Sequence, residues 1–158
     1  DFTPVEQQTE SHDGFEWTVV EVHRAKKMSK CKLCFRVVDG IGKGTFGYVK
    51  KIISLDGAHY AMKQLEYDPR YKNREVSIMR ALDHPNCLEL FYYFVERNSL
   101  TSETTVNLIM ELFPTSLSAL MNQFNDEGEN FPPFYIRLYL YQLLRGTAYI
   151  HFEGIAHR

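Results

Sequence analysis

Apolar and polar residues alternate with a period of two over much of residues 34–112, a pattern typical of β-strands with one face in solvent. The pattern predicts three consecutive antiparallel strands in CFRVV, YVKKIIS and HYAMKQL, then two more strands at about residues 88–95 and 105–112. Residues 73–83 follow helical spacing instead, with Glu75, Met79 and Leu82 on one stripe. The sequence therefore predicts an α+β fold with five strands and one helix before Pro114.

The flanking segments differ in character from this central region. Residues 1–14 are polar and contain Pro and Gly, which indicates a flexible extension, while residues 15–22 could form either a strand or an anchoring segment. After Pro114 we expect a short helix at 117–124 and a longer one at about 134–151. The predicted organisation is an extension at 1–33, partly flexible, a strand-rich region at 34–113 and a helical region at 114–158.

Composition narrows the class of protein. Of the 158 residues, 44% are hydrophobic and 24% are charged, which is typical of a globular chain with a packed core. The net charge of -2 gives no reason to expect nucleic acid or a membrane surface as the main partner. No apolar run approaches the roughly 20 residues that cross a bilayer. A cytosolic or nuclear setting fits best. Five Lys and Arg residues at 23–32 could form a docking patch, but such runs are more often solvated.

The three cysteines favour packing roles over chemistry. Cys31 and Cys34 form a C-x-x-C pair, but a zinc site needs a second pair of ligands at suitable spacing and none follows. Because the segment that contains Cys34 has strand character, we expect these thiols to pack in the sheet, and we predict no metal site.

Residues 42–49, GKGTFGYV, match G-x-G-x-x-G-x-V. In a dinucleotide-binding fold this loop must run from a strand into a helix, whereas here a strand precedes it and a strand follows. The remaining interpretation is a glycine-rich hairpin whose backbone N–H groups can approach the phosphates of a nucleotide. If the segment were only a glycine-rich turn, no related nucleotide-binding motif would be expected later in the sequence.

A second feature does lie downstream. Strand alternation places Ala61, Lys63 and Leu65 on one face, so Lys63 is a charge among apolar neighbours and needs a partner. Glu75 lies on the inward stripe of the next helix and could pair with it. Taken alone, each residue is better explained as a surface charge that reaches solvent, but the glycine-rich hairpin before them favours the ion pair.

Together these motifs resemble a protein kinase. They are G-x-G-x-x-G-x-V, the A-x-K at Ala61 to Lys63, Glu75 in the following helix, His84-Pro85-Asn86, and His157-Arg158 as the start of H-R-D. The segments YKNREVSIMRALDHPN, NLIMELFP and YIRLYLYQLLRGTAYIHFEGIAHR are similar to the glycogen synthase kinase-3 (shaggy-like) family from about Ile41 onward. The resemblance implies a protein-kinase-like fold with a five-stranded antiparallel small lobe and the first helices of an incomplete large lobe.

The resemblance also implies roles for individual residues. Lys63 would contact the phosphates of ATP, and Glu75 would hold Lys63 in place. Met110 falls at the gatekeeper position, where the family more usually has leucine. The full set implied for ATP binding is Ile41, Gly42, Gly44, Phe46, Gly47, Val49, Ala61, Lys63, Met110, Glu111 and Phe113.

Two arginines match family positions that bind a phosphate already present on the substrate, Arg74 and Arg158. The alternatives are a solvated first helical turn for Arg74 and a contact to the activation segment for Arg158. The resemblance thus implies protein substrates, with a preference for pre-phosphorylated ones; scaffold partners cannot be named.

The sequence contains only the first two residues of H-R-D. The resemblance places the catalytic aspartate and the Mg²⁺ ligands after Arg158, so we expect the 158-residue chain to be inactive alone and the complete protein to be a serine/threonine kinase. The helix at 134–151 should expose an apolar face. The alternative function is a catalytically inactive nucleotide-binding or scaffold protein.

Overall fold

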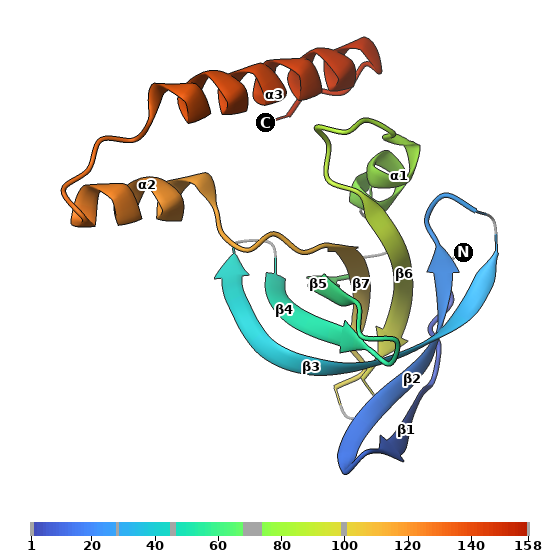
Figure 1. Cartoon of the computed structure of the whole chain (residues 1–158). Coiled ribbons are helices and arrows are strands. Elements are labelled where there is room, and N and C mark those ends of the chain that lie inside the picture. The colour runs from blue at the N-terminus through green and yellow to red at the C-terminus, as the bar shows by residue number, and fades with distance from the viewer. Residues whose placement is uncertain (1, 28, 45–46, 68–73, 99–100, 158) are drawn as a thin grey trace. The chain divides into compact units, whose positions relative to one another are not determined.

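The computed structural model describes residues 2–27, 29–44, 47–67, 74–98 and 101–157. Its seven strands and three helices follow one another along the chain as shown in Figure 1. Their bounds are β1 (Gln7–His12), β2 (Phe15–Arg24), β3 (Lys30–Gly44), β4 (Gly47–Ser54), β5 (His59–Glu66), α1 (Arg74–Ala81), β6 (Leu90–Arg97), β7 (Thr104–Glu111), α2 (Leu117–Asp126) and α3 (Pro133–Phe152).

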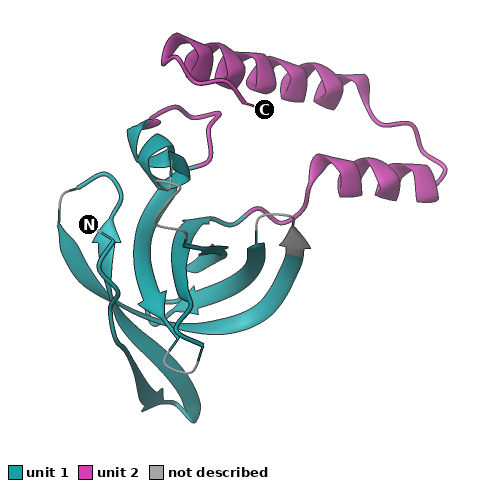
Figure 2. Ribbon diagram, turned by 180° about the vertical axis from the view of Figure 1, so that it is seen from behind, with its two compact units in different colours: residues 1–81, 89–112 teal, residues 82–88, 113–158 magenta. Residues whose placement is uncertain are grey.

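The chain divides into two compact units, coloured separately in Figure 2. Unit 1 comprises residues 1–81 and 89–112 and holds the whole sheet and α1. Unit 2 comprises residues 82–88 and 113–158 and holds α2 and α3.

The sheet of unit 1 has seven described strands, where the sequence predicted five. Its order is β1-β2-β3-β4-β5-β7-β6, and every pairing is antiparallel. The five predicted strands are β3 to β7, and the two additional ones come from residues 1–33. A short pairing of His23 and Arg24 with Tyr93 and Tyr92 also connects β2 to β6.

The two additional strands form a hairpin, which the polar composition of residues 1–14 did not predict. Asp13 and Gly14 form its turn with positive φ angles of 52° and 77°, the conformation that Asp-Gly favours in two-residue hairpins. Residues 7–12 are mostly exposed, because β1 is held by main-chain pairing with β2 rather than by apolar burial. Where we expected a flexible extension, these residues therefore form an edge strand.

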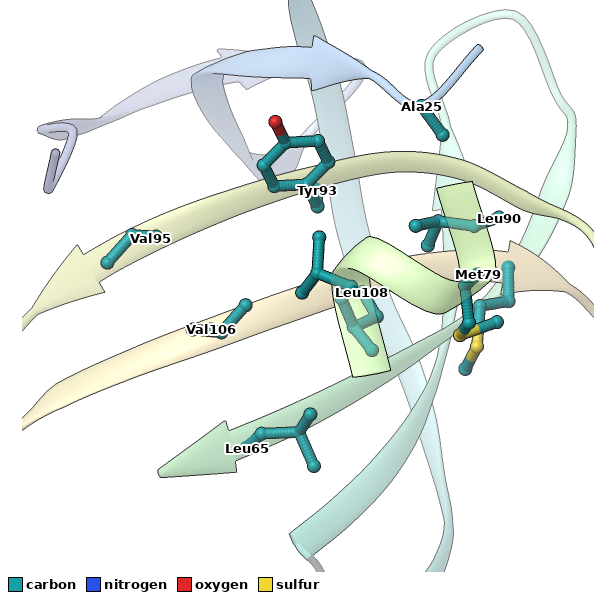
Figure 3. Close-up of a cluster of buried hydrophobic side chains, with 10 residues drawn as sticks. Ala25, Leu65, Met79, Leu90, Tyr93, Val95, Val106 and Leu108 are labelled. Atoms are coloured by element: carbon teal, nitrogen blue, oxygen red, sulfur yellow. The ribbon is translucent and has the colours of Figure 1, made fainter. Parts of the chain in front are cut away.

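The apolar side chains of unit 1 gather in two clusters, one on each face of the central strands. One cluster contains Val20, Val22, Leu33, Phe35, Ile52, Met62, Phe94 and Ile109. The other contains Ala25, Leu65, Val76, Met79, Leu90, Tyr93, Val95, Val106, Leu108 and Met110 (Figure 3). Because Val76 and Met79 belong to the second cluster, α1 packs on that face of the sheet.

In unit 2, the His84-Pro85-Asn86 segment packs against α3. The ring of His84 stacks on that of Tyr149 with centroids 4.9 Å apart, and the Tyr149 hydroxyl accepts a hydrogen bond from the N–H of Asp83 at 3.0 Å. Gly146 lies so close to this segment that a Cβ there would be 2.7 Å from the carbonyl oxygen of Asn86.

Most apolar side chains of α3 stay exposed, as its sequence predicted. The exposed set is Phe134, Tyr135, Ile136, Leu140, Tyr141, Leu143, Leu144 and Phe152. Among the described residues, no helix combines the length and apolar character that a bilayer span requires.

Candidate functional site

Strand register brings four of the predicted site residues onto one face of the sheet. Val49 of β4 is paired with Lys63 of β5, and Ala61 of β5 is paired with Met110 of β7. Residues directly opposite in an antiparallel pair point to the same face, as do residues two apart along a strand. Val49, Ala61, Lys63 and Met110 therefore share the face on which α1 packs.

Lys63 and Glu75 form the ion pair that the sequence predicted. Nζ of Lys63 donates a hydrogen bond to Oε1 of Glu75 at 2.7 Å. The side chains are 23% and 37% exposed, so the pair lies at the border between the apolar cluster and solvent. At this position Glu75 can hold the Lys63 ammonium on one side while its other side stays accessible to a ligand from solvent.

The glycine-rich hairpin joins β3 to β4, with Gly44 paired to Gly47 at its base. Two register irregularities in β3, between Val37 and Asp39 and between Gly40 and Gly42, interrupt the regular pairing before the tip. Phe46 lies outside the described residues. A strand thus enters and a strand leaves this loop, as the hairpin interpretation required.

Two glycines of the motif differ in what constrains them. Gly47 has φ +135°, and a Cβ there would be 1.9 Å from the carbonyl oxygen of Gln64, so the sheet itself requires glycine. Gly42 has nothing within 4 Å of an added Cβ. Ile41, beside it, is also exposed. Gly42 and Ile41 therefore line open space that a ligand could enter.

The predicted hinge residues lie where β7 ends. Met110 is buried, and Glu111 is the last residue of the strand. The N–H of Glu111 donates to the carbonyl of Glu89 at 3.3 Å, so this N–H already has a partner within unit 1. Phe113 is exposed and begins the second segment of unit 2.

Of the two arginines assigned to substrate phosphate, the structure describes one. Arg74 is the first residue of α1 and is exposed, directly before Glu75. Arg158 lies outside the described residues.

The cysteines show no arrangement for metal or redox chemistry. Cys31 and Cys34 are three residues apart on β3, so their side chains point to opposite faces of the sheet. Burial, followed by the nearby carboxylate of Glu10, raises the pKa of the Cys34 thiol, and burial raises that of Cys87, which disfavours the reactive thiolate. Within the described part of the chain, no three His, Cys, Asp or Glu side chains are grouped so that they could hold a metal ion.

The residues that hold the C-terminal end of α1 were not predicted from the sequence. Arg80, in the last turn of the helix, donates from Nε to the carbonyl of Ala25 at 3.2 Å. A basic residue in the last turn is a general helix-end signal, but nothing in the sequence pairs it with Ala25.

Comparisons with known proteins identify the family to which this chain is similar. Residues 35–158 match the family described as the protein kinase domain. The chain is 35% identical over 119 residues to "Protein kinase gsk3" of Schizosaccharomyces pombe, across 75% of this chain and 31% of that protein. It thus spans about a third of the length of that relative. The family match confirms the resemblance to a protein kinase, and the relative supports the narrower similarity to glycogen synthase kinase-3.

Proposed function

Because the chain belongs to the protein kinase family, we propose that it forms the nucleotide-binding part of a serine/threonine kinase that transfers the γ-phosphoryl group of ATP to proteins. The observation that carries this proposal is the 2.7 Å ion pair between Lys63 and Glu75. In kinases such a pair holds the lysine against the α- and β-phosphates.

The residues on the same face suit ATP. An ammonium group has three N–H donors, and the contact with Glu75 leaves others for phosphate oxygens. Val49 and Ala61 supply an apolar surface for an adenine ring, and the open space beside Gly42 suits close backbone approach to phosphates. Magnesium would bridge the phosphates and neutralise their charge, and the family assigns its ligands to segments after H-R-D.

The proposal is tested by Lys63→Met in the full-length protein, with Lys50→Met as the matched control. Lys50 is paired with Met62, so it points to the opposite face from Lys63. We expect Lys63→Met to lower kcat by about 10²- to 10³-fold, because the phosphates lose a preorganised charge, while Lys50→Met retains activity. Unchanged turnover in the Lys63 variant would refute the assignment. ATP binding without any transfer by the wild-type protein would favour the inactive nucleotide-binding or scaffold function instead.

We further propose that the substrates carry a phosphate that Arg74 binds. Its guanidinium is exposed at the start of α1, one residue from Glu75, and the planar fork suits phosphate. We expect Arg74→Ala to raise KM about tenfold for phosphorylated peptides and to leave KM for their unphosphorylated versions unchanged. Equal effects on both peptides would remove this part of the proposal.

A further inference from the structure

Helix α1 is too short to hold its own position. The structure describes eight residues of it, Arg74–Ala81, whereas isolated helices shorter than about 12 residues are marginal in water. Its orientation therefore depends on the contacts that the rest of unit 1 makes with it. Because Glu75 is its second residue, those contacts also determine where the carboxylate that meets Lys63 lies.

Two hydrogen bonds join the connection between β2 and β3 to the C-terminal end of α1, and each segment donates one of them. Nζ of Lys26 donates to the carbonyl oxygen of Arg80 at 3.3 Å. In return, Nε of Arg80 donates to the carbonyl oxygen of Ala25 at 3.2 Å. The last carbonyl groups of a helix lack partners within the helix, so an ammonium there satisfies one of them and opposes the negative end of the helix dipole.

The connection is itself fixed to the sheet. The N–H of Ala25 donates to the carbonyl of Phe91 at 2.9 Å. Ala25 is 3% exposed and belongs to the same apolar cluster as Met79 of α1 (Figure 3). The guanidinium of Arg80 also lies 5.5 Å from the ring centroid of Tyr93 on β6, within the range of a cation–π contact. The two groups that Arg80 contacts, the Ala25 carbonyl and the Tyr93 ring, thus belong to residues that are fixed in the sheet and its apolar cluster.

The two ends of α1 are therefore held by different parts of unit 1. Lys63 of β5 holds the N-terminal end through Glu75, Met79 packs in the middle, and the β2–β3 connection holds the C-terminal end. Met79 fixes the middle of the helix, so loss of the contacts at the C-terminal end would let the helix tilt about that residue, and such a tilt would displace Glu75 at the other end.

We propose that Arg80 and Lys26 are positioning residues that keep Glu75 in reach of Lys63, and that residues 25–27, at the start of the β2–β3 connection, thereby set the fraction of molecules with an assembled phosphate site. This inference rests on the proposed function, because it assigns residues outside the nucleotide site to the same reaction.

The test compares Arg80→Met and Lys26→Met in the full-length protein, with Lys27→Met as the matched control. Methionine keeps an unbranched side chain but removes the charge and the donor. Lys27 is an exposed lysine on the same connection, and it loses the same charge when replaced. The first measurement is hydrogen exchange at the amides of residues 78–81. We expect exchange about fivefold faster in the first two variants, because each loses a net hydrogen bond, and wild-type exchange in the control. Wild-type exchange in all three would overturn the inference.

The second measurement is a double-mutant cycle of phosphoryl transfer between Arg80→Met and Glu75→Gln. If Arg80 acts through Glu75, Arg80→Met should lower kcat about fivefold in the wild-type background and have no further effect once Glu75 is replaced. Arg80→Lys, whose ammonium can still donate to Ala25, should recover most of the loss. The same loss in both backgrounds would mean that Arg80 serves stability alone, and the inference would fail.

The two measurements separate this inference from the proposed function. If the wild-type protein transfers no phosphoryl group, the proposed function fails, and hydrogen exchange alone then decides whether the connection holds α1. If transfer occurs but the cycle is additive, the proposed function stands and the positioning role is wrong.

Discussion

The sheet of unit 1 and helix α3 of unit 2 both carry many large apolar side chains, but they bury them to very different extents. Leu108 of β7 is 0% exposed, whereas Leu143 of α3 is 65% exposed. In the sheet, neighbouring strands and α1 cover both faces of the central strands, while the only buried residue of α3 is Gly146. An apolar pattern thus identifies side chains that would gain from burial, but whether they are buried depends on the tertiary neighbours.

The largest expected effect comes from adding a methyl group where the sheet has no room for it. Gly47→Ala would place Cβ 1.9 Å from the carbonyl oxygen of Gln64, at a φ of +135°. We expect a loss of about 4 kcal/mol in the free energy of unfolding, since both the clash and the backbone conformation are unfavourable. Gly42→Ala is the matched control for stability, because its Cβ would meet open space. Urea unfolding of both variants checks this, and equal stability would contradict it.

The direct comparison of the two regions uses one substitution in each. Leu108→Ala should cost about 3 kcal/mol, because it removes buried surface and leaves a cavity, whereas Leu143→Ala should change stability by less than about 0.5 kcal/mol. Both are measured by urea unfolding of the 158-residue chain, in which the two exposures were found. A similar cost at both positions would show that Leu143 is covered in that chain, and the contrast between the regions would disappear.

The one buried position of α3 allows a milder test in unit 2. Gly146→Ala would bring Cβ within 2.7 Å of the Asn86 carbonyl oxygen, while alanine favours the helix by about 1 kcal/mol. We expect a net loss of about 1 kcal/mol, seen as faster hydrogen exchange in residues 83–88 and α3. Leu144→Ala, at an exposed position of the same helix, should leave exchange in residues 83–88 unchanged. Slower exchange in the Gly146 variant would contradict this prediction, because it would mean that the Asn86 carbonyl moves away from the added Cβ at little cost.

The smallest expected effect depends on pH and belongs to unit 1. Burial, followed by the positive charge of Lys30, lowers the pKa of His23 below the ordinary value of 6.5. Its ring stacks on Tyr93 at 4.9 Å. Because the unfolded chain binds a proton at this side chain more readily than the folded one, His23 should lower stability as pH falls below about 6.5. His23→Phe keeps an aromatic ring and cannot titrate, so its stability should fall less between about pH 7.5 and about pH 5. Parallel pH profiles for the two proteins would contradict this.

Local patterns were enough to predict most elements and the centre of the candidate site. Period-two alternation identified β3 to β7, and helical spacing identified α1 and α3. An isolated lysine on an apolar face required a partner, which the structure shows to be Glu75. These patterns did not predict β1, because its polar residues are held by main-chain pairing, although Asp13-Gly14 was an available hairpin signal.

The sequence alone thus determined the type of most elements, the glycine-rich hairpin and the need for an ion pair at Lys63, because each depends on spacing within a short segment. The tertiary structure decided that β7 lies between β5 and β6, that Gly47 faces the Gln64 carbonyl, and that Arg80 meets Ala25. These features join segments far apart in the chain through main-chain atoms. Because every residue carries the same main-chain groups, the identity of the side chains does not reveal such partners.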